Sequence, residues 1–274
     1  MQEANAGLAH IDLGLILVLL ILGFGAGFLS GLFGIGGAVV MIPMLLYVPP
    51  LLVHVGLPKH EVYAISIAPV FFASLSGMMV HRKNRFLSGK LAMYMGGATL
   101  IGSLAGALVS GSMHGSLLNI VFAVLALLAA VVMFFPKHEE DGPVDPDRVS
   151  FNRVLAMFSA LVIGVMAGLV GAGGAFLLIP VMIYLLRIPT RVTIATSLAV
   201  AMVSASATLV GKIASGQMHY LAAAALVVGS IPGAQLGGNT SKKMAAQVLR
   251  VSLAVVITLV AFLMWDNVLA TTKL

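Results

Sequence analysis

Long apolar runs, separated by short polar connections, occupy most of the chain. A run of about 20 apolar residues is long enough to cross the roughly 30 Å hydrocarbon core of a bilayer as a helix. Runs of spanning or near-spanning length cover residues 13–33, 37–57, 64–80, 91–110, 115–135, 154–170, 174–186, 193–211, 220–237 and 248–265. This pattern predicts an all-α polytopic membrane protein with 8–10 transmembrane segments. The composition agrees, because 60% of the 274 residues are hydrophobic and only 9% are charged.

The acidic residues lie at the edges of the apolar runs or in the connections between them. They are Glu3, Asp12, Glu61, Glu139, Glu140, Asp141, Asp145, Asp147 and Asp266. The sequence contains no HExxH zinc motif, no pair of carboxylates within a run and no P-loop. It also contains no cysteine, which excludes thiol nucleophiles, iron–sulfur clusters and disulfides. We therefore expect no enzyme, no metal site and no cofactor.

The net charge of +6 follows from basic residues that lie between the runs. Four clusters contain Arg82, Lys83, Arg85 and Lys90; Lys137, Arg148 and Arg153; Arg187 and Arg191; and Lys242, Lys243 and Arg250. Loops rich in Lys and Arg stay on the cytoplasmic side of a membrane. An N-terminus outside the cell places all four clusters inside and leaves Lys59, Lys212 and Lys273 outside. We interpret the charge as a topology signal and expect no nucleic-acid partner. The N-terminus lacks the basic region of a cleavable signal peptide, so we expect it to be retained.

The chain contains an internal repeat. Residues 27–47 align without gaps to residues 164–184, and ten of the 21 positions are identical. The match resumes at an offset of 131, which pairs Ala64, Ser66 and Ala68 with Ala195, Ser197 and Ala199. We therefore expect a first membrane repeat, a cytoplasmic linker and a second membrane repeat, at residues 1–135, 136–150 and 151–274.

The number of runs in each half predicts how the two repeats are oriented. After a glycine-rich hairpin, each half has three further apolar runs, so the second copy enters the membrane upside down relative to the first. If the hairpin arms are instead full spans, each half makes four crossings, and the basic residues divide about evenly between the two sides. We prefer the inverted repeat because of the asymmetric loop charge, and inverted repeats are typical of secondary transporters.

Two glycine turns interrupt the apolar runs at matching positions in the halves. Each turn is followed by a short apolar segment with a proline six residues after the last glycine, and Pro43 and Pro180 are predicted to break the returning helix. The geometry that we expect is a helical hairpin whose returning half-helix directs unpaired N–H groups into the protein, where they attract anions. The predicted binding residues are Gly34, Gly36, Gly37 and Ala38 in the first turn and Gly171, Gly173, Gly174 and Ala175 in the second. The alternative, close helix packing, is the interpretation that we prefer for Gly23, Gly27, Gly31, Gly164 and Gly168.

Polar residues in the next helix also occur at matching positions. Ser66 and Ser197 correspond to each other, and Thr196 stands beside the second. Their hydroxyls are candidates to complete an anion site, with a bond to their own helix as the alternative. His81 and Lys212 also correspond, at the far end of that helix. We expect them to be interfacial anchors that snorkel to the surface, with a role at the two mouths of a pathway as the alternative.

The duplicated turns, GLFGIGGAVVMIP and GLVGAGGAFLLIP, resemble those of the TauE/SafE family of sulfite and organosulfonate permeases. The resemblance extends over both halves and implies a multi-pass protein of the bacterial inner membrane. It also implies export of small sulfur oxyanions such as sulfite, sulfonates or sulfoacetate. Ala38 and Ala175 stand where the family often has a further glycine.

Together these patterns predict a secondary transporter that works by alternating access, with the anion held between the two turns. A channel for anions, or a permease for other small anions such as carboxylates, is the alternative. The expected partners are the anion and the lipid bilayer, and a homodimer is left open.

Overall fold

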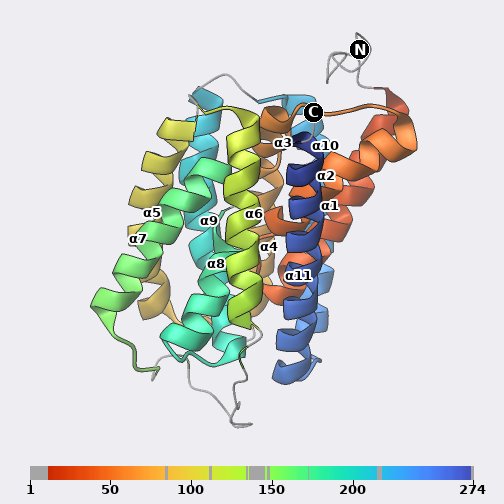
Figure 1. Ribbon diagram of the computed structural model, residues 1–274. Coiled ribbons are helices and arrows are strands. Elements are labelled where there is room, and N and C mark those ends of the chain that lie inside the picture. The colour runs from red at the N-terminus through yellow and green to blue at the C-terminus, as the bar shows by residue number, and fades with distance from the viewer. Residues whose placement is uncertain are drawn as a thin grey trace.

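The computed structural model describes residues 12–83, 86–110, 113–133, 135, 146, 149–171, 173–214 and 218–272. The N-terminal residues 1–11, most of the linker 136–150 and Lys273 lie outside this part. The described residues form α1 (Leu13–Phe33), α2 (Ala38–Val53), α3 (Lys59–Ile65), α4 (Ile67–Lys83), α5 (Gly89–Ser110), α6 (Gly115–Met133), α7 (Arg153–Val170), α8 (Ala175–Pro180), a π-helix (Val181–Leu185), α9 (Thr190–Ala214), α10 (Tyr220–Ser241) and α11 (Ala246–Thr272). The predicted all-α fold is confirmed for these residues, which contain no strand (Figure 1).

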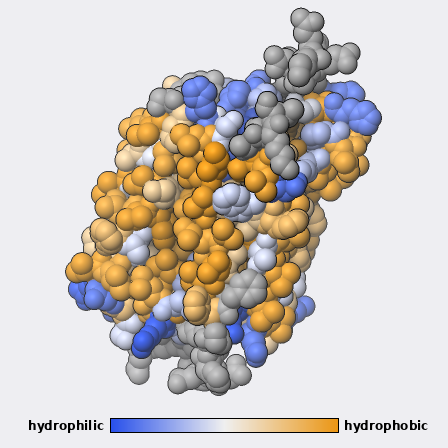
Figure 2. Space-filling view, viewed as in Figure 1, coloured by the Kyte–Doolittle hydropathy of each residue, from blue (hydrophilic) through white to orange (hydrophobic). Residues whose placement is uncertain are grey.

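Among the described residues, eight helices are long and apolar enough to cross a membrane, when α3 and α4 are counted as one span. The exterior agrees with this, because large apolar side chains such as Ile21 and Phe262 are 69% and 72% exposed. Figure 2 shows an apolar surface along the middle of the molecule, with hydrophilic residues gathered toward its two ends. Such a surface suits lipid around the middle and water at the ends. The protein is therefore a multi-pass membrane protein.

The helices begin at corresponding residues in the two halves. Three helices of the second half begin 131 residues after their counterparts, at Lys59 and Thr190, Gly89 and Tyr220, and Gly115 and Ala246, whereas α8 begins 137 residues after α2 and α7 begins 140 residues after α1. The capping agrees as well, since the side chains of Asp12 and Asn152 accept hydrogen bonds from backbone N–H groups at the starts of α1 and α7. The sequence repeat thus coincides with repeated helix boundaries. The orientation of the halves relative to the membrane stays a prediction.

The closest helix pairs join one half to the other. α1 packs along α10, and α5 packs along α7. Glycines line both contacts: a Cβ on Gly27 would collide with the carbonyl of Ser230, and one on Gly168 with the carbonyl of Ser103. The prediction that Gly23, Gly27, Gly31, Gly164 and Gly168 serve helix packing is confirmed, because a Cβ on each would collide with backbone atoms of the partner helix.

Helices α4 and α9 form the centre of the molecule. They pack against each other, α4 also contacts α10, and α9 also contacts α5. The spans that contain α4 and α9 are the most buried of the eight, and each has 72% of its apolar window inside the protein. These two corresponding helices therefore provide the inner wall against which the turns lie.

The helical segment that follows each glycine turn is short. At 1.5 Å per residue, α2 is roughly 24 Å long and α8 with its π-helix roughly 16 Å, both below the 30 Å of a membrane core. The predicted break at Pro43 is wrong, because α2 continues through Pro43 to Val53. Neighbouring helices in a membrane protein can satisfy the carbonyl that a proline leaves free. In the second copy the π-helix begins directly after Pro180.

Candidate functional site

The two glycine turns have the same backbone conformation. All six of their glycines have positive φ: 77°, 76° and 83° at Gly34, Gly36 and Gly37, and 75°, 65° and 70° at Gly171, Gly173 and Gly174. A side chain at such angles is strained, so the turn needs glycine at these positions. Gly34 and Gly171 end α1 and α7, and each donates its N–H to the carbonyl four residues earlier at 2.8 Å. Gly37 and Gly174 then precede the first residues of α2 and α8.

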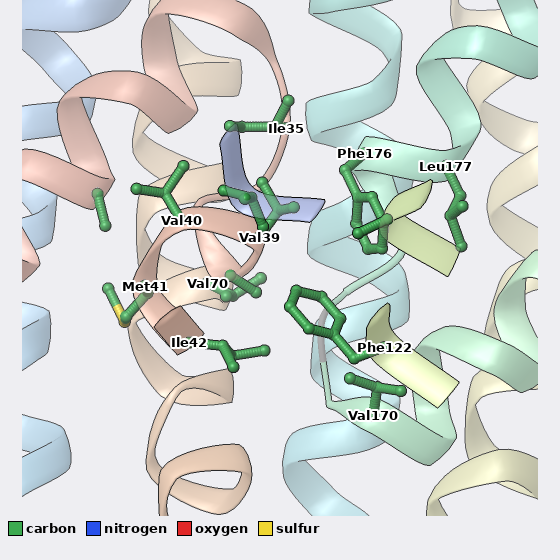
Figure 3. Packing of buried hydrophobic residues seen from close by; sticks show 14 of the residues in the cluster. Ile35, Val39, Val40, Met41, Ile42, Val70, Phe122, Val170, Phe176 and Leu177 are labelled. Carbon is green, nitrogen blue, oxygen red and sulfur yellow. The ribbon is translucent and has the colours of Figure 1, made fainter. Parts of the chain in front are cut away.

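The two turns meet inside the protein. A Cβ placed on Gly36 would lie 3.3 Å from the Cβ of Ala175, the first residue of α8. Figure 3 shows the apolar side chains around this meeting point, where Ile35 and Val39 lie on one side and Phe176 on the other. All three side chains are at most 1% exposed. The structure thus brings Gly36 of the first turn to Ala175 of the second, whereas Gly34 and Gly171 lie against the backbones of Ile194 and Tyr63.

One face of α4 and the matching face of α9 contact the turns. Ser66, which ends α3, is followed at intervals of four by Val70 and Ser74 on α4, and Ser197 is followed in the same way by Ala201 and Ala205 on α9, so each set shares a face. A Cβ on Gly36 would lie 3.6 Å from the Cβ of Ala201. A Cβ on Gly173 would lie 2.7 Å from Val70 Cγ1 and 3.8 Å from the carbonyl oxygen of Ala201. Ala201 therefore lies between the two turns.

The three predicted hydroxyls have different surroundings. Ser197 Oγ donates a hydrogen bond at 2.8 Å to the carbonyl of Gly34 and lies 3.0 Å from the carbonyl of Ile194. Ser66 Oγ donates to the carbonyl of Tyr63 in its own helix, at 3.2 Å. Thr196 Oγ1 accepts the N–H of Ser88 at 3.3 Å. Only Ser197 contacts a turn, and its single proton points to a carbonyl, so it holds the turn in place.

Two hydroxyls that the sequence analysis did not name lie beside the first turn. Ser74 Oγ is 3.6 Å from a Cβ placed on Gly36, and Ser30 Cβ is 3.3 Å from one placed on Gly37. Both side chains are 0% exposed, and neither oxygen has a partner among the described residues. Spacing alone could have found them, since Ser30 precedes Gly34 by one helical turn and Ser74 follows Ser66 by two.

The start of α2 also has free donors. The first N–H groups of α2 that find a partner belong to Val40 and Met41, which both donate to the carbonyl of Gly37, at 3.2 and 2.9 Å. In the described part of the chain, the N–H groups of Ala38 and Val39 have no acceptor. The positive end of the helix dipole lies at the same place. These groups favour an anion.

Comparison with known proteins identifies the family. A family model described as sulfite exporter TauE/SafE matches residues 19–264. The chain belongs to the TauE/SafE family. This confirms the resemblance of the duplicated turns, both of which lie inside the match. The family consists of membrane transporters, and membrane transport is the activity that the match supports for this TauE/SafE protein.

Relatives of this TauE/SafE protein extend over nearly its whole length. YunE of Bacillus subtilis is 25% identical over 260 residues, which cover 89% of this chain and 94% of YunE. YdhB of the same species is 29% identical over 86% of this chain and 93% of YdhB. A protein of Methanocaldococcus jannaschii is 24% identical over 91% of this chain and 95% of its own length. All three are named probable membrane transporter proteins. No solved structure matches the chain significantly.

The basic residues at the ends of α4 and α9 do not reach the surface. His81 is 3% exposed and Lys212 is 2% exposed, so the expectation that they snorkel to the surface is wrong. His81 Nε2 donates to the carbonyl of Gly31 in the last turn of α1, at 3.0 Å. Lys212 Nζ donates to the hydroxyl of Ser110, the last residue of α5, at 3.0 Å. Oxygens near the ends of neighbouring helices thus bind Nε2 of His81 and Nζ of Lys212 inside the protein, whereas Nδ1 of His81 is buried without a partner among the described residues.

A basic pocket lies next to the first turn. It is lined by His81, Phe86, Arg191, Ile194, Ser241 and Lys242. Arg191 is held there by a hydrogen bond of 3.0 Å to the carbonyl of Met244 and stacks on the ring of Phe86. Ile194 connects the pocket to the turn, because its carbonyl oxygen lies 2.6 Å from a Cβ placed on Gly34. Within the described residues, no group of His, Asp or Glu could hold a metal ion.

Proposed function

We propose that this TauE/SafE protein is a secondary transporter that exports small sulfur oxyanions such as sulfite, sulfonates or sulfoacetate. The supporting observation is that two glycine turns meet inside a multi-pass membrane protein and place the starts of α2 and α8 together. The description of the family as a sulfite exporter supports the sulfur oxyanion. The surroundings suit an anion too, since no acidic residue occurs in residues 13–60, 62–138 or 148–265.

The anion binds at the turns, and access alternates between the two sides of the membrane. The helix packing suggests which parts move. α1 with α10, and α5 with α7, are held by backbone contacts at glycines, so each pair moves as one body. Rocking one sequence repeat against the other would separate both pairs. The moving bodies are therefore α1, α2 and α10 on one side and α5, α7 and α8 on the other, with α4 and α9 between them.

The direction of transport follows from charge. The protein lies in the inner membrane of a bacterium with its N-terminus outside, and the basic pocket at Arg191 and Lys242 then faces the cytoplasm and gathers anions there. An inside-negative potential favours expulsion of one negative charge by about 2.3 kcal/mol per 100 mV. Export therefore needs no coupling ion.

Counterflow in proteoliposomes tests the function. The purified protein is reconstituted with unlabelled sulfite inside, and uptake of labelled sulfite is followed. A carrier gives uptake that the trans anion accelerates. High conductance without trans-acceleration means an anion channel. Acceleration by carboxylates but not by sulfite or sulfonates means a permease for other anions, and either result overturns the proposal.

Substitutions in the turns test the position of the site. Gly37→Leu and Gly174→Leu add a side chain at positive φ beside the half-helix starts, and we expect each to lower sulfite affinity at least tenfold. Gly97→Leu is the matched control, because a Cβ on this helical glycine of α5 meets nothing within 4 Å. Affinity is measured by thermal shift of the purified proteins with increasing sulfite. Parent-like affinity in both turn variants would place the site elsewhere.

A further inference from the structure

The two turns differ in the side chains beside them. Ser30 and Ser74 flank the first turn, whereas the corresponding positions beside the second turn are Ala167 and Ala205. A Cβ on Gly174 would lie 2.8 Å from the Cβ of Ala167, and one on Gly173 would lie 3.9 Å from the Cβ of Ala205. The backbone of the turn is thus repeated, but the hydroxyls occur in one copy only.

In the part of the chain that the structure describes, the two serines are buried without a hydrogen-bond partner, as are the hydroxyls of Thr193 and Ser204 on α9. Ser30 and Ser74 are both 0% exposed, and neither hydroxyl oxygen has a hydrogen-bond partner among the described residues. A buried hydroxyl in this state destabilises a protein, and alanine would fit at lower cost. The second half has alanine at both positions. The hydroxyls of the first half therefore need an explanation other than folding.

The helices that follow the two turns also differ, and the longer one follows the first turn. α2 is a regular helix of 16 residues, and the N–H groups of Ala38 and Val39 at its start lack acceptors in the described part of the chain, as do those of Ala175 and Phe176 at the start of α8. α8 has only six residues before the π-helix, so its aligned peptide dipoles are fewer. The stronger helix end and the two free hydroxyls lie at the same turn.

We propose that the anion site is one-sided: Ser30, Ser74 and the first N–H groups of α2 bind the oxyanion, and the second turn, which has alanine in place of both serines and a shorter helix after it, closes over it. This inference rests on the proposed function of anion transport. Two hydroxyls and two N–H groups provide four donors, which suit the three oxygens of a sulfite or sulfonate group better than a spherical halide. Ser30 and Ser74 then determine specificity for oxyanions.

The test compares Ser30→Ala and Ser74→Ala with two other serine variants. Ser206→Ala is the matched control, since its hydroxyl donates to the carbonyl of Val203 in its own helix. Ser66→Ala tests the hydroxyl pair that the repeat predicts. Sulfite and chloride affinities are measured by thermal shift of the purified proteins, and sulfite counterflow is measured in proteoliposomes. We expect Ser30→Ala and Ser74→Ala each to weaken sulfite binding ten- to a hundredfold, as expected for loss of a hydrogen bond to a charged group, with little change for chloride.

The Tm of the unliganded protein distinguishes an anion-binding role of the two serines from a structural role. Because both hydroxyls are unpartnered, their removal should leave the Tm of the unliganded protein unchanged or raise it, while the rise in Tm on adding sulfite shrinks. A parent protein that binds sulfite while Ser30→Ala and Ser74→Ala bind it equally well overturns the one-sided site and leaves the proposed function standing. A parent that binds neither sulfite, sulfonates nor carboxylates overturns both.

Discussion

Glycine has two separate physical uses in this protein. In the turns it supplies positive φ, as at Gly36 with φ 76°. In the helices it allows two backbones to touch, as at Gly27 against the carbonyl of Ser230. The sequence distinguishes the two uses, because turn glycines occur as GxGG before a proline and packing glycines recur every four residues along a helix. The distinction is clear because the GxGG turn with its proline occurs in both halves.

Substitution at neighbouring glycines of α1 should separate packing from helix propensity. We expect Gly27→Ala to destabilise the protein by about 1–3 kcal/mol, because the new methyl group collides with α10. Gly25→Ala is the matched control on the same helix, where a Cβ meets nothing within 4 Å and alanine is the better helix former. The measurement is thermal unfolding in detergent. Equal Tm values for the two variants would mean that α1 and α10 do not pack closely.

A search for residues that recur in both halves does not identify Ser30 and Ser74. Searching for residues that match in both halves identifies Ser66 and Ser197, yet the structure shows one bonded within its own helix and the other holding a turn. The hydroxyls that lie free at the first turn have alanine as their counterparts. A repeat reveals what both copies need for folding, and a single bound anion does not need both copies to be equal.

At the scale of elements, the apolar runs predicted the helices well and their internal irregularities less well. The run at 193–211 became α9, Thr190–Ala214, because polar first and last turns can extend a helix whose middle is apolar. Pro43 predicts a break that tertiary packing overrides. The burial of His81 and Lys212 was not predictable either, because a basic residue at the end of an apolar run gives no sign of the helix end that binds it.

The pocket at the start of α9 gives a prediction about charge. Arg191 lines this pocket and stacks on Phe86, whereas Arg153 stacks on Tyr94 without lining it. We expect Arg191→Gln to raise the apparent KM for sulfite several-fold at low ionic strength when the anion is supplied on the cytoplasmic side, with a smaller effect at high salt, where screening is stronger. Arg153→Gln should change KM less at both salt concentrations. An equal effect of the two variants would mean that the anion does not pass through this pocket.

At the scale of the whole molecule, the sequence predicted two repeats but not which helices of one repeat pack against which helices of the other. Packing glycines indicate that a helix approaches another closely, yet their spacing does not identify the partner. In the structure α1 pairs with α10 and α5 with α7, so both pairs cross between the halves. Each moving body that we propose therefore combines elements of both repeats, and the central helices α4 and α9 must shift against these bodies during transport.

Cross-linking α5 to α9 tests this movement. A Cβ on Gly96 would lie 4.0 Å from the Cβ of Val203, within the range that a disulfide requires. The sequence has no cysteine, so Gly96→Cys with Val203→Cys introduces the only pair of thiols. If α5 moves against α9 during each cycle, oxidation should reduce sulfite counterflow at least tenfold, and reduction should restore it. The single variants, treated with the same oxidant, should keep parental rates. Full counterflow by protein whose disulfide is verified by mass spectrometry would mean that α5 and α9 move together, and the moving bodies would have to be assigned differently.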